Sequence, residues 1–262
     1  MFLTHGLLAL SMIAARADAT VSVDYAGSLV ATMEGPIARA FLAERGIRFE
    51  GEGKGSKAIA NLIAAGLRTP DVFISADPKL LAPLRSSELI STYAVLGSAR
   101  MVIAFSSGSP HAALLSEAAR GSRSILDVLA APALRVGRTD PALDPKGVRT
   151  IHALRLLGAQ SHRSNEAERV LRQSQTFPEE DLAVRVESGE LDAGFFYSTE
   201  TVPMRLKTIE LPARANLSNE IVYAIATLTN APHPQAARAF VDFLLRGSGR
   251  GILEHAGLRM FR

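Results

Sequence analysis

The stretch that decides the fold is residues 20–29, TVSVDYAGSL, read together with residues 70–77, PDVFISAD. Each is an apolar run of strand length that ends in a turn of small and polar residues. Between them, helical periodicity covers residues 29–45 and 57–67, with a short strand at 47–50 that runs into a glycine-rich turn. Strands and helices therefore alternate, and this order predicts right-handed crossover units on a doubly wound sheet.

The alternation continues to the end of the chain, which closes with two helices. Long strands near residues 100 and 222 bracket a middle block, so the chain can leave a first lobe, build a second and return. We predict an α/β fold with lobe I at 20–100 plus 222–262 and lobe II at 101–221, hinged by two crossover strands. Each lobe is expected to be a mixed sheet flanked by helices. A single large doubly wound domain remains the alternative on pattern alone. The further strands are predicted at residues 99–106, 133–137, 191–197 and 219–228.

Composition excludes several classes of protein. With 47% hydrophobic and 21% charged residues, the 262-residue chain can bury a large core. The net charge of +3 is spread along the chain without a basic block, which argues against a nucleic-acid partner. The absence of cysteine excludes disulfides, cysteine-bound metal, thiol nucleophiles and a lipid-modified cysteine.

Residues 1–19 differ in character from the rest. An apolar run from Gly6 to Ala15 is followed by Ala-x-Ala triplets that end at Ala17 and Ala19. This pattern predicts a signal peptide cleaved after one of those alanines, which leaves about 243–245 residues. A buried N-terminal helix is the alternative. No other stretch is long enough to span a membrane, so we expect an exported protein that is neither membrane-inserted nor lipid-anchored.

No catalytic constellation is recognisable. The six histidines show no metal-ligand spacing, and the chain has no G-x-S-x-G nucleophile motif. The glycine-rich segment at residues 51–57 lacks the order and spacing of a phosphate-binding P-loop. We therefore predict no catalytic residue, no metal site made by protein ligands alone, no cofactor and no enzymatic activity.

Three polar turns stand where a strand gives way to a helix. They contain Ser28, Ser56 and the segment Asp144–Val148. A helix N-terminus offers free N–H groups and partial positive charge, so several that converge form an anion site without lysine or arginine. Taken singly, each serine is more simply an N-cap, Asp144 a turn residue and Tyr197 a core aromatic. Their conjunction favours an anion site.

The ordered set of motifs resembles the periplasmic solute-binding proteins of ABC importers, above all the molybdate/tungstate-binding family. The resemblance covers the whole mature chain. It rests on the two opening motifs, on the G-x-G-S turn, and on three later segments, GRTDPALDPKGVRT (137–150), SGELDAGFFY (188–197) and AARAFVDFLLRGSGRGILEHAGL (236–258).

The resemblance implies a type II periplasmic-binding-protein fold that closes on a tetrahedral oxyanion. Lobe I would supply the hydroxyls at Ser28 and Ser56. Lobe II would supply the backbone amide of Lys146, a further amide near Asp181, and the Tyr197 hydroxyl. Bound molybdate or tungstate would be cargo, and the partner would be the permease of the importer, with the receptor itself a monomer.

One branch of the family uses an aspartate and a glutamate to expand the metal centre to six oxygen ligands. Asp144 stands where that aspartate would, as a possible ligand to molybdenum or tungsten, but Phe196 replaces the glutamate. We therefore favour a four-coordinate anion with Asp144 as a cap. A cage of donors alone accepts a fully ionised dianion and rejects a protonated one. The alternatives are a receptor for sulfate or phosphate, or an enzyme or sensor on the same fold.

Overall fold

The computed structural model describes residues 19–261. Almost all of the predicted signal peptide, residues 1–18, lies outside this range, so its cleavage remains a prediction. Within residues 19–261, every helix is too short or too polar to cross a lipid bilayer.

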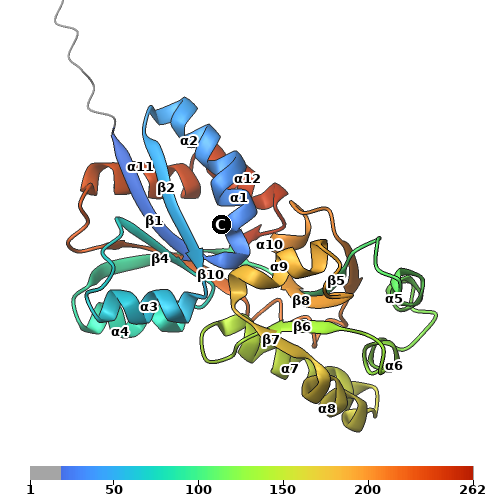
Figure 1. Ribbon diagram of the computed structural model, residues 1–262. Coiled ribbons are helices and arrows are strands. Elements are labelled where there is room, and N and C mark those ends of the chain that lie inside the picture. Colours follow the sequence, from blue (N-terminus) through green and yellow to red (C-terminus); the bar gives the residue numbers. More distant parts are fainter. Residues whose placement is uncertain (1–18, 262) are drawn as a thin grey trace, which may run out of the picture.

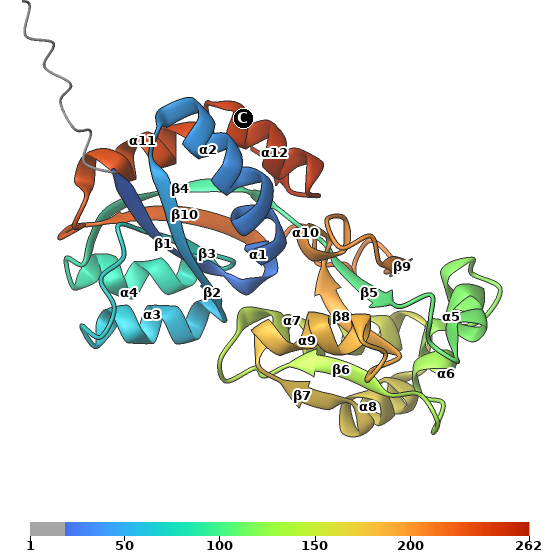
Figure 2. The same cartoon turned by 45° about the horizontal axis from the view of Figure 1, so that its top comes forward.

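The strands among residues 19–261 form two mixed sheets, one in each half of the molecule (Figures 1 and 2). The six-stranded sheet has the order β11-β4-β10-β3-β1-β2, and the five-stranded sheet has the order β7-β6-β8-β5-β9. The names lobe I and lobe II are used below for the halves that contain the six-stranded and the five-stranded sheet, and the exact bounds of the lobes stay a prediction.

Lobe I is built around a parallel core with antiparallel additions. β1 (Thr20–Ala26) lies between β2 (Arg48–Lys54) and β3 (Val72–Ser75), parallel to both. β10 (Val222–Leu228) returns from lobe II and inserts antiparallel between β3 and β4 (Ile90–Ser98). The short β11 (Arg259–Met260) completes the edge beside β4.

Helices cover both faces of the lobe I sheet. Because strand side chains alternate between faces, Val23 and Tyr25 of β1 pack on the side of Phe41 and Phe240, while Phe73 of β3 packs on the other side. The segments of lobe I are η1 (Gly27–Leu29), α1 (Val30–Thr32), η2 (Met33–Ile37), α2 (Ala38–Arg45), α3 (Ser56–Ala64), η3 (Pro78–Leu80), α4 (Leu81–Ser86), α11 (Pro234–Leu245) and α12 (Ser248–His255).

Lobe II repeats the design with fewer strands. β6 pairs in parallel with β7 and β8, whereas β5 runs antiparallel to β8 and β9. Its strands are β5 (Met101–Phe105), β6 (Val136–Thr139), β7 (Gln175–Phe177), β8 (Ala193–Tyr197) and β9 (Lys207–Glu210). Its helices are α5 (Ala112–Ala119), α6 (Ile125–Leu129), α7 (Pro145–Gln160), α8 (Ser164–Gln173), α9 (Glu179–Glu187) and α10 (Ser198–Thr201).

Two predicted elements differ from the structure. The glycine-rich turn after residue 50 is strand as far as Lys54, because these residues continue the parallel pairing with β1 up to Ala26. Glycine fits there because Gly51 and Gly53 lie against the Tyr25 ring, where a Cβ would approach within 2.6 and 2.9 Å. The helix expected over 29–45 is broken, because Pro36 lies inside it and the backbone widens to a π-turn at η2.

Candidate functional site

The predicted site residues of both lobes meet at the junction between the lobes. Ser28 follows β1, Ser56 begins α3 after β2, Asp144 precedes α7 after β6, and Tyr197 ends β8. The carboxyl ends of these strands therefore face the junction, as is usual for ligand sites in doubly wound sheets. All four residues are buried.

Asp144 bridges the two lobes. Its Oδ1 accepts a hydrogen bond from the Lys146 amide at 2.7 Å, and its Oδ2 accepts one from the Ser56 amide at 3.1 Å. Asp144 is thus the N-cap of α7, as favoured from sequence, and it also meets the first residue of α3 in lobe I. Burial, followed by the charge of Glu179, raises the pKa of Asp144 to about 7. We call this arrangement the Asp144 bridge.

A close backbone approach supports the Asp144 bridge. The amide of Ala58 donates to the Leu143 carbonyl across the junction at 3.1 Å. A Cβ on Gly55 would lie 2.6 Å from that same carbonyl oxygen, so this position needs glycine. The N-terminus of a lobe I helix is thereby held directly against the N-terminus of a lobe II helix.

The two serines have different partners. The Ser28 hydroxyl lies 2.7 Å from the Tyr223 hydroxyl, which in turn lies 3.1 Å from Oγ1 of Thr199. The Ser56 hydroxyl accepts a hydrogen bond from the Ala76 amide at 3.1 Å. The contact between Ser28 and Thr199 through Tyr223 crosses the junction.

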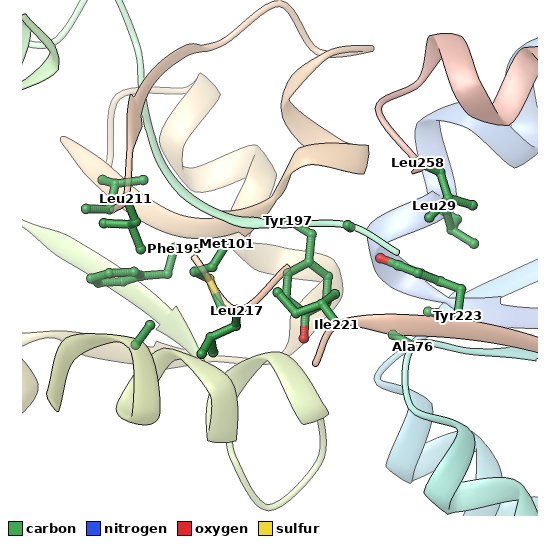
Figure 3. Packing of buried hydrophobic residues seen from close by; sticks show 14 of the residues in the cluster. Leu29, Ala76, Met101, Phe195, Tyr197, Leu211, Leu217, Ile221, Tyr223 and Leu258 are labelled. Carbon is green, nitrogen blue, oxygen red and sulfur yellow. The ribbon is translucent and has the colours of Figure 1, made fainter. Parts of the chain in front are cut away.

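Tyr197 supplies a free hydroxyl at the same place. The residue is 1% exposed, and its hydroxyl makes no hydrogen bond of ordinary geometry with any of residues 19–261. Its ring packs edge-on against that of Tyr223, with the centroids 6.3 Å apart, as Figure 3 shows in the packing between the lobes. Burial raises the pKa of Tyr197 well above its usual value, and the nearby Arg149 charge opposes this rise. The hydroxyl is therefore a neutral donor.

The side chain of Lys146 is buried beside the Asp144 bridge. Its Nζ donates to Glu179 at 2.8 Å and to Glu200 at 2.7 Å. Burial alone would lower the pKa of Lys146, but the charges of Glu179 and Glu200 outweigh it and raise this pKa. The other oxygen of Glu200 accepts from the Tyr197 amide at 2.7 Å. Glu179 also reaches lobe I, where it lies against Gly27.

Asp181 stands apart from these contacts. It lies in the first turn of α9, where its amide bonds to the Pro178 carbonyl at 3.3 Å and its carboxylate pairs with Arg185. The structure does not join its amide to the Asp144 bridge. Its assignment as a ligand residue remains a prediction.

Cavities open on both sides of the junction and share no lining residue. One, of about 360 Å³, has a lining that includes three acidic residues, Asp77, Asp144 and Glu220, and four basic ones, Lys57, Lys79, Arg149 and His152. The other, of about 540 Å³, is lined by Ser28 and five glutamates, Glu34, Glu179, Glu180, Glu187 and Glu200. No cluster of three metal-ligating side chains occurs in the part of the chain that the structure describes.

Sequence reasoning missed the side chains of Lys146, Arg149, Glu179, Glu200 and Tyr223. Glu200 carries a weak signal, because it stands three residues after Tyr197, the spacing at which a glutamate bonds back to a helix start. Tyr223 lies within an apolar strand and gives no signal. The buried state of Lys146 depends on α9 and α10, which lie far along the chain.

Comparison with known proteins gives the family. Residues 21–259 match the family of bacterial extracellular solute-binding proteins. The chain belongs to this family. Its resemblance to the molybdate/tungstate-binding group, stated from sequence, is confirmed by the relatives that follow.

Three curated relatives have names that specify a ligand. A Haloferax volcanii relative, named as an ABC transporter molybdenum-binding protein, is 35% identical over 76% of this chain, and the match spans 62% of that relative's length. The molybdate/tungstate-binding protein of Pyrococcus abyssi is 26% identical over 89% of this chain, and the match spans 82% of that protein's length. The molybdate-binding protein of Mycobacterium tuberculosis is 29% identical over 78% of this chain and 70% of its own.

Solved structures confirm the predicted fold class. The periplasmic molybdate-binding protein of Azotobacter vinelandii superposes with a TM-score of 0.75 at 18% identity, over 92% of this chain and all of that one. The sulfate-binding protein of M. tuberculosis superposes with a TM-score of 0.68 at 14% identity, over 92% of this chain and 87% of that one. The solute-binding protein described here therefore has the type II periplasmic-binding-protein fold.

Proposed function

We propose that this solute-binding protein is an extracytoplasmic receptor that holds molybdate or tungstate between its lobes and delivers it to an ABC-type importer. The proposal rests on the names of the relatives and, above all, on one observation at the junction. Helix N-termini from both lobes converge on the carboxylate of Asp144. A carboxylate is itself an oxyanion, so these amides are already arranged to bond oxyanion oxygens.

The donors proposed for the anion are neutral. They are the amides of Ser56 and Lys146, the hydroxyls of Ser28 and Ser56, and the Tyr197 hydroxyl, whose buried, unbonded state fits a ligand donor. A burial-raised pKa keeps that hydroxyl protonated. In this arrangement the anion accepts the hydrogen bonds that the Ser56 and Lys146 amides now donate to Asp144. The Asp144 side chain then rotates away from these amides or becomes a ligand to molybdenum or tungsten.

Location and partner belong to the same proposal. We infer that a signal peptide directs the chain to the periplasm, where it acts as a monomeric receptor with the permease as its partner. The division into lobes at residues 100–101 and 221–222 defines the two halves that close on the ligand. The receptor performs no chemical step on its cargo.

Calorimetric titration of the mature protein tests the proposal. We expect molybdate and tungstate to bind with dissociation constants below about 10 μM, more tightly than sulfate and phosphate. Tight binding of sulfate or phosphate alone would favour the alternative anion receptor. Binding of an organic solute without any oxyanion would overturn the assignment.

The matched variants Ser28→Ala and Ser86→Ala test the site. Loss of a hydrogen bond to a charged ligand should weaken binding in Ser28→Ala by about 1–3 kcal/mol. Ser86 is exposed on α4 and bonds only within its own helix, so its variant should bind as the wild type does. Equal affinities of the two variants would remove Ser28 from the site.

A further inference from the structure

Arg149 occupies a special position at the junction. It lies on α7 three residues after Lys146 and is 9% exposed. Its Nη2 reaches the Asp77 carboxylate of lobe I at 3.1 Å and the Glu220 carbonyl at 3.0 Å. Glu220 belongs to the segment that returns the chain to lobe I through β10. One guanidinium thus touches lobe II, lobe I and the returning crossover.

The same guanidinium faces the predicted anion site. It lies beside the Tyr197 hydroxyl and acts on its pKa, although no hydrogen bond of ordinary geometry joins them. It also lines the cavity that contains Asp144. The ion pair with Asp77 and the hydrogen bond to the Glu220 carbonyl both come from Nη2, so Nε and Nη1 take no part in these two contacts.

The charged side chains at the junction distinguish Arg149 from the other buried cation there. Of the described residues, Lys146 and Arg149 are the buried cations. Lys146 is paired with two carboxylates, those of Glu179 and Glu200. Asp144 adds a third buried carboxylate, so a dianion would enter a region that is already rich in negative charge. Arg149 faces one carboxylate, that of Asp77, whereas Lys146 faces two, so Arg149 is the cation that can add more attraction for such a ligand.

We propose that Arg149 couples anion binding to lobe closure, because it attracts the bound oxyanion while it holds Asp77 of lobe I and the crossover at Glu220. This inference rests on the proposed function and adds to it a positioning residue outside the neutral cage. Without its guanidinium, the anion would lose attraction and the lobes would lose a contact that the anion strengthens.

The test uses calorimetry with sodium molybdate and small-angle scattering of the full mature protein with and without molybdate. The variants are Arg149→Ala, Arg149→Lys, Asp77→Asn and the double variant. Arg155→Ala is the matched control, because Arg155 is an exposed arginine of the same helix that pairs with Glu168. Circular dichroism monitors folding of every variant.

We expect Arg149→Ala to weaken molybdate binding at least about tenfold and to abolish molybdate-induced compaction. Arg149→Lys should keep part of the affinity, and Asp77→Asn should reduce compaction while weakening binding only several-fold. The double variant should bind no worse than Arg149→Ala, since Asp77 acts through Arg149. Arg155→Ala should match the wild type.

The outcomes separate the inference from the proposed function. If the wild type binds no oxyanion, both are overturned. If the wild type binds and Arg149→Ala stays within about threefold of it, the coupling alone is overturned. If Arg149→Ala fails to fold, Arg149→Lys and Asp77→Asn decide, and wild-type affinity and compaction in both would overturn the coupling.

Discussion

On one side of the junction, Lys146 is enclosed by Glu179 and Glu200 and has no exposed surface. On the other side, Arg149 pairs with Asp77, whose side chain is 20% exposed, and faces an open cavity lined by both basic and acidic side chains. We call these the lysine side and the arginine side. On the lysine side, the positive charge of Lys146 is paired with two glutamates of the protein itself. On the arginine side, the positive charge of Arg149 can still attract a ligand. We therefore expect the lysine side to contribute mainly to stability and, if the inference about Arg149 holds, the arginine side to contribute to binding.

The strongest test of the lysine side removes its cation. Lys146→Met leaves Glu179 and Glu200 buried without a counter-charge and should lower the free energy of unfolding by about 3–5 kcal/mol. Urea denaturation at pH 7 measures this change. Lys207→Met, at an exposed lysine of β9, is the control and should change stability little. A loss below about 1 kcal/mol would show that Lys146 does not stabilise these carboxylates.

The pH dependence of stability tests the lysine side at Glu200. Burial raises the pKa of Glu200 to about 7, while an unfolded glutamate ionises near 4.3. Between these values the unfolded chain loses its proton and the native chain keeps it, so this group destabilises the fold as pH rises. Its contribution should be full below about pH 4 and lost by about pH 7.

The variant Glu200→Gln does not titrate at this position. Its free energy of unfolding relative to the wild type should therefore rise by about 1–2 kcal/mol between pH 5 and pH 7. Denaturation curves at several pH values measure the difference. A difference that stays constant over this range would mean that Glu200 titrates in the native protein as it does when unfolded.

The smallest effect should be found at the paired tyrosines between the two sides. Tyr197→Phe removes a hydroxyl that makes no hydrogen bond of ordinary geometry with any of residues 19–261, so stability should be unchanged while molybdate binding weakens by about 1–1.5 kcal/mol. Tyr223→Phe breaks the contacts to Ser28 and Thr199 and should lower stability by about 1–2 kcal/mol. Thermal denaturation and calorimetry separate the two effects, and identical behaviour would contradict the assignment.

The sequence predicts the framework of the site well because that framework is local. Ser28, Ser56 and Asp144 each stand at a turn between a strand and a helix, and the alternation of strands and helices places such turns at one edge of a sheet. The fold class could also be predicted, since the apolar runs are long and clearly spaced. The Asp-Pro pair at 144–145 identified the N-cap of α7.

The chemistry between the lobes could not be predicted, because it depends on residues far apart in sequence. Ser28 and Tyr223 are 195 positions apart, and no local pattern announces their contact. Lys146 occupies a helix start where a lysine usually extends into solvent, and only the packing of Glu179 and Glu200 around it changes this. β4 and β9 were missed because each contains polar and exposed residues.

The position of β10 has a consequence for the order in which the molecule assembles. Its residues, 222–228, fill the gap between β3 and β4, whereas lobe II needs nothing beyond β9 to complete its own sheet. As the chain is made from its N-terminus, the inserted half can finish first. Lobe I, which contains the first strands of the chain, lacks the strand between β3 and β4 until β10 has been synthesised. The junction between the lobes, which needs both halves, is then the last part of the molecule to form.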